Sequence, residues 1–171
     1  SNYFYLNEEG RRLRNVTDET GMTTYLTYSS YTLLDADFDG DQDVIAIPIN
    51  GPVSIFENRM SDNASIAVDI RNADGNINAI GAEVIVRHAG SNAQQLKEIS
   101  ASGGFVSFDV PEAYFGLGSD AGVEEVRVRW PDGQESVITG QFDAGYKFRI
   151  RRIADTSLLA GGNTPVEVGA N

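Results

Sequence analysis

The nine residues Asp35-Ala36-Asp37-Phe38-Asp39-Gly40-Asp41-Gln42-Asp43 carry an aspartate at every odd position and run directly into the apolar stretch Val44-Ile45-Ala46-Ile47. Five carboxylates this close repel one another strongly unless a cation lies among them. Hard divalent ions take oxygen ligands, and acids at positions 1, 3 and 5 with a glycine at position 6 can surround one Ca²⁺. We therefore interpret the stretch as a calcium loop that leads into a β-strand.

The spacing of the loop excludes an EF-hand. That motif needs a bidentate acid at its twelfth position and a helix on each side, whereas the twelfth position here is Ala46, inside an apolar β run. A dockerin-like loop fails for the same reason, which leaves a nine-residue loop with Gly40 at its tight turn. The predicted metal ligands are Asp35, Asp37, Asp39, Asp41 through its backbone carbonyl, and Asp43.

Composition limits the class of protein. The chain has 171 residues and a formal net charge of -12, from 25 acids against 13 bases. A surface of this sign repels a phosphate backbone, so we expect no nucleic-acid partner. The absence of cysteine excludes disulfides, thiolate metal sites and cysteine nucleophiles. No apolar run approaches the roughly 18 residues that a membrane span needs.

Short runs rich in Val, Ile, Tyr, Phe and Thr alternate with Gly, Asn and Asp clusters, which predicts an all-β fold. A polar boundary at 58–64 indicates two domains, 1–60 and 61–153, followed by a tail over 154–171. We expect that tail to be flexible, with Pro165-Val166-Glu167-Val168 as a possible edge strand. The expected strands are 3–6, 12–16, 27–34, 44–48, 53–57, 65–71, 82–88, 94–100, 106–110, 124–129, 135–138 and 147–152.

A faint repeat pairs Tyr5-Leu6-Asn7-Glu8 with Ile55-Phe56-Glu57-Asn58, a spacing of about 50 residues that is typical of one four-stranded propeller blade. A single blade cannot bury both of its faces, because blades are stabilised by their neighbours. We therefore expect residues 1–60 to lean on the rest of the chain, on a part of the protein outside this sequence, or on another subunit. Residues 1–20 are too polar for a signal peptide, which suggests a processed form or a piece of something longer.

The loop Asp-x-Asp-x-Asp-Gly-x-x-Asp of residues 35–43, followed by hydrophobic β residues, resembles the calcium loop of FG-GAP or VCBS repeats of integrin-type β-propellers. Residues 5–10 and 16–22 resemble the start of such a repeat. The sequence departs from that pattern at Arg11-Arg12-Leu13-Arg14, where the family has a glycine, small residues and an aromatic. The resemblance implies a propeller-blade-like unit with calcium in a structural role.

Three motifs in the second half resemble the ASPIC and UnbV domain, which follows FG-GAP repeats in proteins like cartilage acidic protein and in bacterial secreted proteins. They are Asn78-Ala79-Ile80-Gly81-Ala82, Phe115-Gly116-Leu117-Gly118, and Val126-Arg127-Val128-Arg129-Trp130-Pro131-Asp132-Gly133. From the residues themselves, the last motif predicts a strand with one buried face and a tight turn at 130–133. Gly116 and Gly118 suggest a close approach to a neighbouring strand. We expect the domain to be an antiparallel β-sandwich.

Three further features have plainer interpretations. Residues 72–78 alternate oxygen-bearing side chains but hold a single acid, so a hairpin turn is favoured over a second metal loop. His88 is the only histidine, which excludes a multi-histidine metal centre, and we place it at the exposed end of a strand. The basic cluster Arg149, Arg151 and Arg152 fits a solvated sheet edge or a pair with the acidic surface of a neighbour.

No pair of acids and no nucleophile beside a base stands out, and we expect no enzymatic activity. The favoured function is an extracellular, calcium-binding module for adhesion to, or recognition of, protein or carbohydrate. The alternative is a self-assembling subunit of a surface layer or filament, joined by exchange of strands across open sheet edges.

Overall fold

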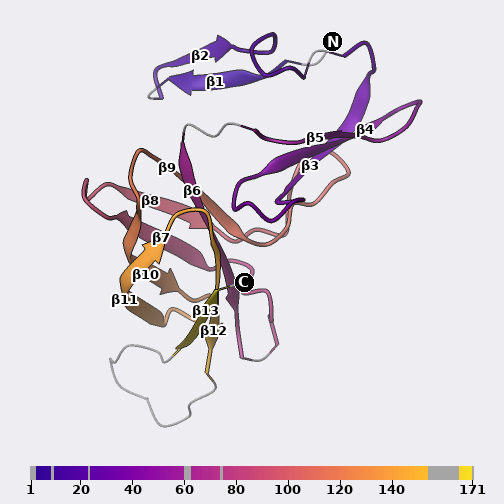
Figure 1. Cartoon of the computed structure of the whole chain (residues 1–171). Helices are drawn as coiled ribbons and strands as arrows, with labels where there is room; N and C mark the ends of the chain where they lie inside the picture. Colours follow the sequence, from indigo (N-terminus) through magenta and orange to yellow (C-terminus); the bar gives the residue numbers. More distant parts are fainter. Residues whose placement is uncertain are drawn as a thin grey trace.

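The computed structural model describes residues 3–8, 10–22, 24–59, 63–73, 75–153 and 166–170. Within these ranges every regular element is a strand, and the fold is all-β as predicted (Figure 1). The described part of the chain contains no helix long and apolar enough to cross a membrane.

Two four-stranded sheets form a sandwich from residue 64 onward. The β6 sheet has the order β13-β12-β6-β9, with bounds Val166–Ala170, Lys147–Arg152, Ala64–Arg71 and Ala113–Gly118. The β10 sheet has the order β11-β10-β7-β8, with bounds Glu135–Asp143, Gly122–Arg129, Glu83–His88 and Gln94–Glu98. Each sheet turns one face inward, so alternate residues are buried.

The core lies between these sheets. Fully buried aliphatic side chains come from both, Ile66, Val68 and Ile70 on β6 facing Val126 and Val128 on β10. Complete burial of a side chain of this size stabilises the fold by about 1.5–3 kcal/mol. Other large side chains of the same core are Phe115, Trp130, Phe142 and Ile150.

The tight turn predicted at 130–133 is present. The Gly133 N–H donates to the Trp130 carbonyl at 2.9 Å, and Gly133 has a φ of 83°, which glycine adopts without strain. The Trp130 indole is buried, and its Nε1–H donates to the Ser136 hydroxyl at 2.8 Å. The motif therefore serves the core and orders the β10–β11 hairpin.

Residues 1–60 form two sheets where the sequence predicted one four-stranded blade. Strands β1 (Tyr5–Glu8) and β2 (Arg12–Asn15) make a hairpin. Strands β3 (Tyr28–Leu34), β4 (Asp43–Pro48) and β5 (Ser54–Phe56) make the β4 sheet. Turns at 17–21 separate the hairpin from β3, so the blade is divided (Figure 1).

One other prediction about strands was wrong. Residues 106–110 form no strand, because Val106 has a φ of 55° in a turn. The strand lies further on, at β9, which contains Phe115-Gly116-Leu117-Gly118 itself. A Cβ at Gly116 would meet no described heavy atom within 4 Å, so close approach does not explain that glycine, whereas Gly118 has a φ of 60°.

The pairing of the second half also differs from the expected antiparallel pattern at one place. Strands β12 and β6 pair in parallel, with Arg149 opposite Asp69, while the other pairs are antiparallel. Strand β13 pairs with β12 of the same chain, so residues 166–170 form an edge strand where a flexible tail was the favoured expectation; residues 154–165 lie outside the described ranges. Segment 72–78 is no hairpin, since β6 and β7 belong to different sheets.

A close contact between β10 and β11 offers a test of the packing. An added Cβ at Gly122 would overlap the backbone carbonyl oxygen of Phe142, whereas one at Gly116 would enter open space. We expect Gly122→Ala to lower the free energy of unfolding by about 1–3 kcal/mol. Gly116→Ala is the matched control and should stay within about 0.5 kcal/mol of the wild type. Urea denaturation measures both, and equal losses in the two variants would contradict this account of the contact.

Candidate metal centre

The acidic loop connects β3 to β4 and is clamped at both ends. Leu34, the last residue of β3, pairs with Asp43, the first residue of β4. The paired strands therefore place Asp35 and Asp43 at the same end of the β4 sheet. Strand β4 continues into Ala46, which is fully buried, so the apolar residues after the loop anchor it.

The backbone of the loop turns tightly. Phe38 and Gly40 have φ values of 65° and 90°. The Asp39 N–H donates to Asp37 Oδ1 at 3.3 Å, and the Asp41 N–H donates to Asp39 Oδ1 at 3.1 Å. A Cβ at Gly40 would also come within 3.1 Å of the Gly145 carbonyl carbon, so two constraints favour glycine there. These turns direct successive aspartates toward one centre.

Three of the five predicted ligands gather closely. Asp35, Asp37 and Asp39 each offer a carboxylate oxygen, and these oxygens lie within 4.8 Å of one another. Asp37 and Asp39 are exposed, whereas Asp35 is 5% exposed. Three buried carboxylate oxygens of the loop have no hydrogen-bond partner among the described residues: both oxygens of Asp35, and Oδ1 of Asp41. Buried carboxylate oxygens without partners are costly, and a bound cation would satisfy them.

Asp43 has a different environment from the other four aspartates. It is 1% exposed, and its Oδ2 and Oδ1 accept from the N–H groups of Ala36 and Asn58, each at 2.8 Å. These bonds tie the start of the loop to the segment that follows β5. Because a carboxylate has about four lone-pair sites, Asp43 keeps acceptor capacity beyond these two bonds.

Burial and crowding raise the pKa of two aspartates in the loop. Desolvation, followed by repulsion from Asp39 and Asp43, raises the pKa of Asp41 to about 6. Desolvation and repulsion from Asp39 raise the pKa of Asp37 as well. Ionising the whole loop is therefore unfavourable without a positive charge nearby.

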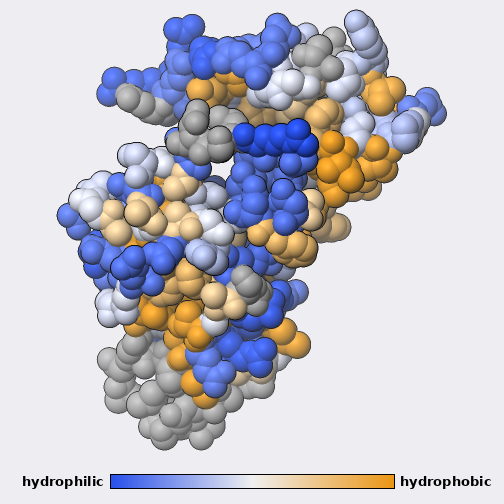
Figure 2. Space-filling model, in the orientation of Figure 1, coloured by the Kyte–Doolittle hydropathy of each residue, from blue (hydrophilic) through white to orange (hydrophobic). Residues whose placement is uncertain are grey.

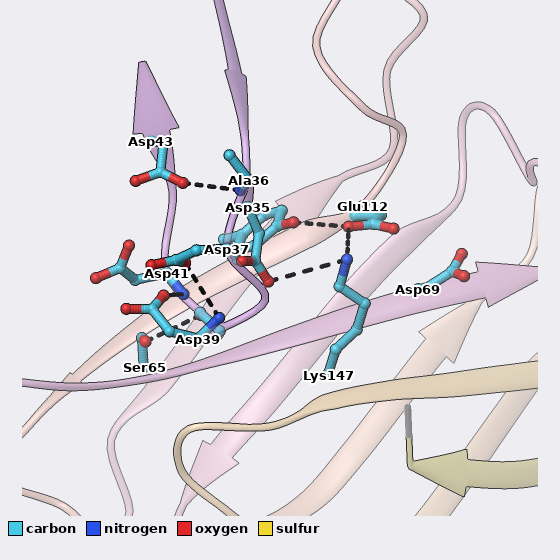
Figure 3. Close-up of polar contacts among 12 residues, drawn as sticks. Asp35, Ala36, Asp37, Asp39, Asp41, Asp43, Ser65, Asp69, Glu112 and Lys147 are labelled. Carbon is cyan, nitrogen blue, oxygen red and sulfur yellow. Dashed lines mark hydrogen bonds and ion pairs between the residues drawn. The ribbon is translucent and has the colours of Figure 1, made fainter. Parts of the chain in front are cut away.

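The loop also meets the sandwich. The Ser65 hydroxyl, on β6, donates to the Gly40 carbonyl at 2.9 Å, and the Gly145 N–H donates to the Ser65 carbonyl at 2.8 Å. Lys147, on β12, places its Nζ 4.0 Å from Asp35 Oδ2 (Figure 3). The loop thus lies at the junction between the β4 sheet and the β6 sheet.

Lys147 belongs to a small buried network. Its Nζ lies 3.0 Å from Glu112 Oε2, which also accepts a hydrogen bond of 2.7 Å from the Tyr114 hydroxyl (Figure 3). Burial and the hydrogen bond to Glu112 raise the pKa of Tyr114. No local sequence pattern points to Lys147, Glu112 and Tyr114, because they lie more than 75 positions from residue 35 in the chain.

Two more contacts join the β4 sheet to the sandwich. The Thr32 hydroxyl donates to the Phe108 carbonyl at 2.5 Å, and the Leu33 N–H donates to Asp109 Oδ1 at 2.8 Å. Residues 108–109 therefore cover the free edge of β3, which supports the expectation that residues 1–60 lean on the rest of the chain.

The sandwich also contains a segment that matches a known family. Residues 72–148 match the model of the ASPIC and UnbV family. The ASPIC and UnbV segment begins directly after β6 and ends within β12, so it contains the β10 sheet and β9. The acidic loop lies outside it. No curated protein matches the chain.

The remaining candidates from the sequence lie apart from the loop. His88 is buried, contrary to prediction: its Nδ1 lies 2.8 Å from Asp120 Oδ2 and its Nε2 lies 2.8 Å from Gln95 Nε2. His88 is the last residue of β7, so its ring can contact both Gln95 on β8 and Asp120 just after β9. In segment 72–78, the Asn76 side chain binds the backbone of Ile80 through its amide oxygen and nitrogen. Asp74, the single acid there, lies outside the described residues.

The raised pKa of Asp41 predicts how pH acts on the metal-free fold. In the folded state Asp41 binds its proton more tightly than in the unfolded chain, so its contribution to stability is present below pH 4 and is lost as the pH rises toward about 6. We expect the melting temperature of the wild type in chelator to fall over this window relative to that of Asp41→Asn. Parallel pH profiles for the two proteins would contradict the assignment.

Proposed function

We propose that the chain is a calcium-binding β module of the FG-GAP or VCBS type joined to an ASPIC and UnbV domain, and that calcium has a structural role. One observation carries the proposal: the Asp35 carboxylate is buried, has no hydrogen-bond partner among the described residues, and lies in a cluster with Asp37 and Asp39. An acidic cluster alone would fit a solvated turn. A buried member whose carboxylate oxygens accept no hydrogen bond, and whose cationic neighbour Lys147 is 4.0 Å away, does not.

The donor set favours Ca²⁺ over other ions. The loop offers oxygen atoms alone, from Asp35, Asp37 and Asp39 side chains, the Asp41 carbonyl and Asp43. Nitrogen and sulfur ligands, which zinc prefers, are missing from it, and the one histidine, His88, binds Asp120 on the sandwich. A flexible nine-residue loop with several carboxylates suits the larger, less directional Ca²⁺ better than the strict octahedron of Mg²⁺.

The proposed role follows from where the loop lies. Gly40 touches Ser65 and Gly145, and Asp35 lies beside Lys147, so fixing the loop would also fix the contact between the β4 sheet and the sandwich. A bound Ca²⁺ would cancel the repulsion within the loop. Asp43 holds the two ends of the loop together through its hydrogen bond from the Ala36 N–H, and joins the loop to Asn58 through a second one.

Calorimetry and thermal unfolding test this proposal together. We expect Ca²⁺ to bind with an affinity between millimolar and micromolar, the range of extracellular modules and sensors. At 100 times the dissociation constant the ion should stabilise the fold by about 2.7 kcal/mol. For a chain of this size that raises the melting temperature by about 5–10 °C.

The matched variants are Asp39→Asn, in the loop, and Glu98→Gln, on exposed β8. Each removes one negative charge. Asp39→Asn should weaken Ca²⁺ binding by at least about tenfold, since a direct carboxylate ligand is lost, and Glu98→Gln should leave it unchanged. Equal heats for both variants, or a melting temperature that ignores chelation, would contradict a specific site.

We further propose that the module works outside the cell in adhesion or recognition of protein or carbohydrate, where free calcium would keep such a loop loaded. The feature that supports recognition is an exposed apolar surface on the β4 sheet and beside it. Figure 2 shows apolar side chains gathered there. The exposed members are Ile47, Ile49, Val53 and Ile55 of the sheet region and Phe105, Val106 and Phe108 of the adjoining loop. Apolar patches that monomers leave open commonly serve as contact sites.

The same surface favours a second candidate function, self-assembly into a surface layer or filament. Strand β5 is the free edge of the β4 sheet, and Ile55 on it is 64% exposed. Light scattering after size exclusion, at protein concentrations up to about millimolar with and without Ca²⁺, distinguishes the two. Assembly predicts oligomers whose mass falls in Ile55→Lys, and a monomer under all conditions would eliminate it.

A further inference from the structure

We propose that an arginine-lined groove on the outer face of the β6 sheet binds an organic oxyanion, a carboxylate, sulfate or phosphate group carried on a ligand with a small apolar body. The groove has a volume of about 600 Å³ and lies at the end of the sheet remote from the acidic loop. It does not depend on the calcium proposal. Four of the chain's 13 basic residues line it: Arg71, Arg149, Arg151 and Arg152.

The strand register places three of these arginines on one surface. Along β6 and β12 the even-numbered residues Ile70 and Ile150 enter the core, so Arg71, Arg149 and Arg151 face outward. In the parallel pair of β12 and β6, Arg151 lies directly opposite Arg71. Two like charges at paired positions repel one another, and an anion between them would remove that cost.

A buried carboxylate orients two of the guanidinium groups. Asp69 is fully buried, with Arg71 Nε 2.8 Å from its Oδ1 and Arg149 Nε 2.7 Å from its Oδ2. Arg149 uses its Nε for this contact, and its two terminal nitrogens have no partner among the described residues. The side chain is therefore held at its inner edge while the terminal pair of donors, the geometry that grips a carboxylate or sulfate with two bonds, stays available.

Arg151 supplies the second available guanidinium. It is exposed, and in the described part of the chain no ion pair or hydrogen bond involves its side chain. Glu167 on β13 lies opposite it in the register but makes no ion pair with it. Arg152, by contrast, is fully engaged: it contacts Asp132 at 2.7 Å and stacks 5.3 Å from the centre of the Trp130 ring.

The outer face of the β10 sheet shows what a purely structural arginine cluster looks like in this protein. Arg87, Arg127 and Arg129 each contact two glutamates there, with separations of 3.0–3.4 Å for Arg127 and Arg129. Among the described residues Arg149 contacts one acid, Asp69, and Arg151 makes no ion pair. The sequence suggested a solvated sheet edge here, but β12 lies between β13 and β6, so the cluster is within the sheet; pairing with a neighbouring molecule stays a prediction.

The chemistry of the groove limits its ligand. Ile77 and Ile153 lie on its walls and are 60% and 40% exposed, so an apolar body has a surface to contact beside the arginines. A net charge of -12 repels dense polyanions such as nucleic acids or highly sulfated chains. A ligand with one or a few oxyanion groups fits both conditions.

The test uses probes that differ in charge alone. Benzoate and neutral benzamide have nearly the same shape, and ¹H–¹⁵N NMR titration of the full chain reports where each binds. We expect benzoate to shift the amide signals of 71–73 and 149–153, and benzamide to leave them in place. Phenyl phosphate and benzenesulfonate, titrated alongside, identify which oxyanion is held most tightly.

Two charge-matched variants complete the experiment. Arg151→Gln should weaken benzoate binding by about tenfold, as expected from the loss of a charge-assisted hydrogen bond. Arg129→Gln on the β10 sheet should leave the dissociation constant unchanged. Arg151→Gln should keep the melting temperature of the wild type, because its side chain is exposed and makes no ion pair among the described residues. Equal shifts with benzamide, equal losses in the two variants, or no shift by any of the three anions at tens of millimolar would overturn the proposal.

Discussion

The desolvated carboxylate of Asp35 is the constraint on which the arrangement of the two halves depends. It stands at the end of β3, on the border between the β4 sheet and the sandwich, and has the Lys147 ammonium 4.0 Å away as its nearest positive charge. A charge that is removed from water must be compensated within a few ångströms. Lys147, which also contacts Glu112, provides part of that compensation at the junction.

The two halves differ in how they are stabilised. The sandwich has a continuous core with fully buried side chains from both of its sheets. In the described part of residues 1–60, the buried apolar residues are Val16, Ala46 and Pro48, and about half of the large apolar side chains there are exposed. That half therefore depends on backbone pairing, on Asp43, and on contacts with β6 and residues 108–109. Electrostatic and hydrogen-bond contacts at the junction replace a hydrophobic core.

Local patterns in the sequence were sufficient for most of the fold. Alternation in 126–130 predicted the burial of Val126, Val128 and Trp130 and the turn after them. The tight turn at Gly40 was predicted from the spacing of the loop. The structure adds a second reason for glycine there, because an added Cβ would come too close to the backbone of Gly145. These features are encoded within a few residues, where side-chain period and turn chemistry act directly.

What the sequence could not show involves residues far apart in the chain. The burial of His88 depends on Asp120 and Gln95, and the orientation of Arg149 depends on Asp69, which lies 80 residues earlier. The parallel pairing of β12 with β6 has no local signature, so neither the junction at Lys147 nor the arginine groove could be derived from spacing alone. The prediction of a strand at 106–110 was wrong for a different reason: the composition is typical of a strand, but the backbone turns at Val106.

The parallel pairing has a consequence for how the molecule forms. Strand β6 sits at the centre of its sheet, yet its neighbour β12 is made some 80 residues later, and β13 later still. Contacts of such long sequence separation carry a large loop-closure entropy and slow the search for the native state. During synthesis, β6 therefore has one backbone edge without its partner β12 until residues 147–152 have been made, although β9 can pair with its other edge earlier. Until then that unpaired edge is a place where another chain can add a strand.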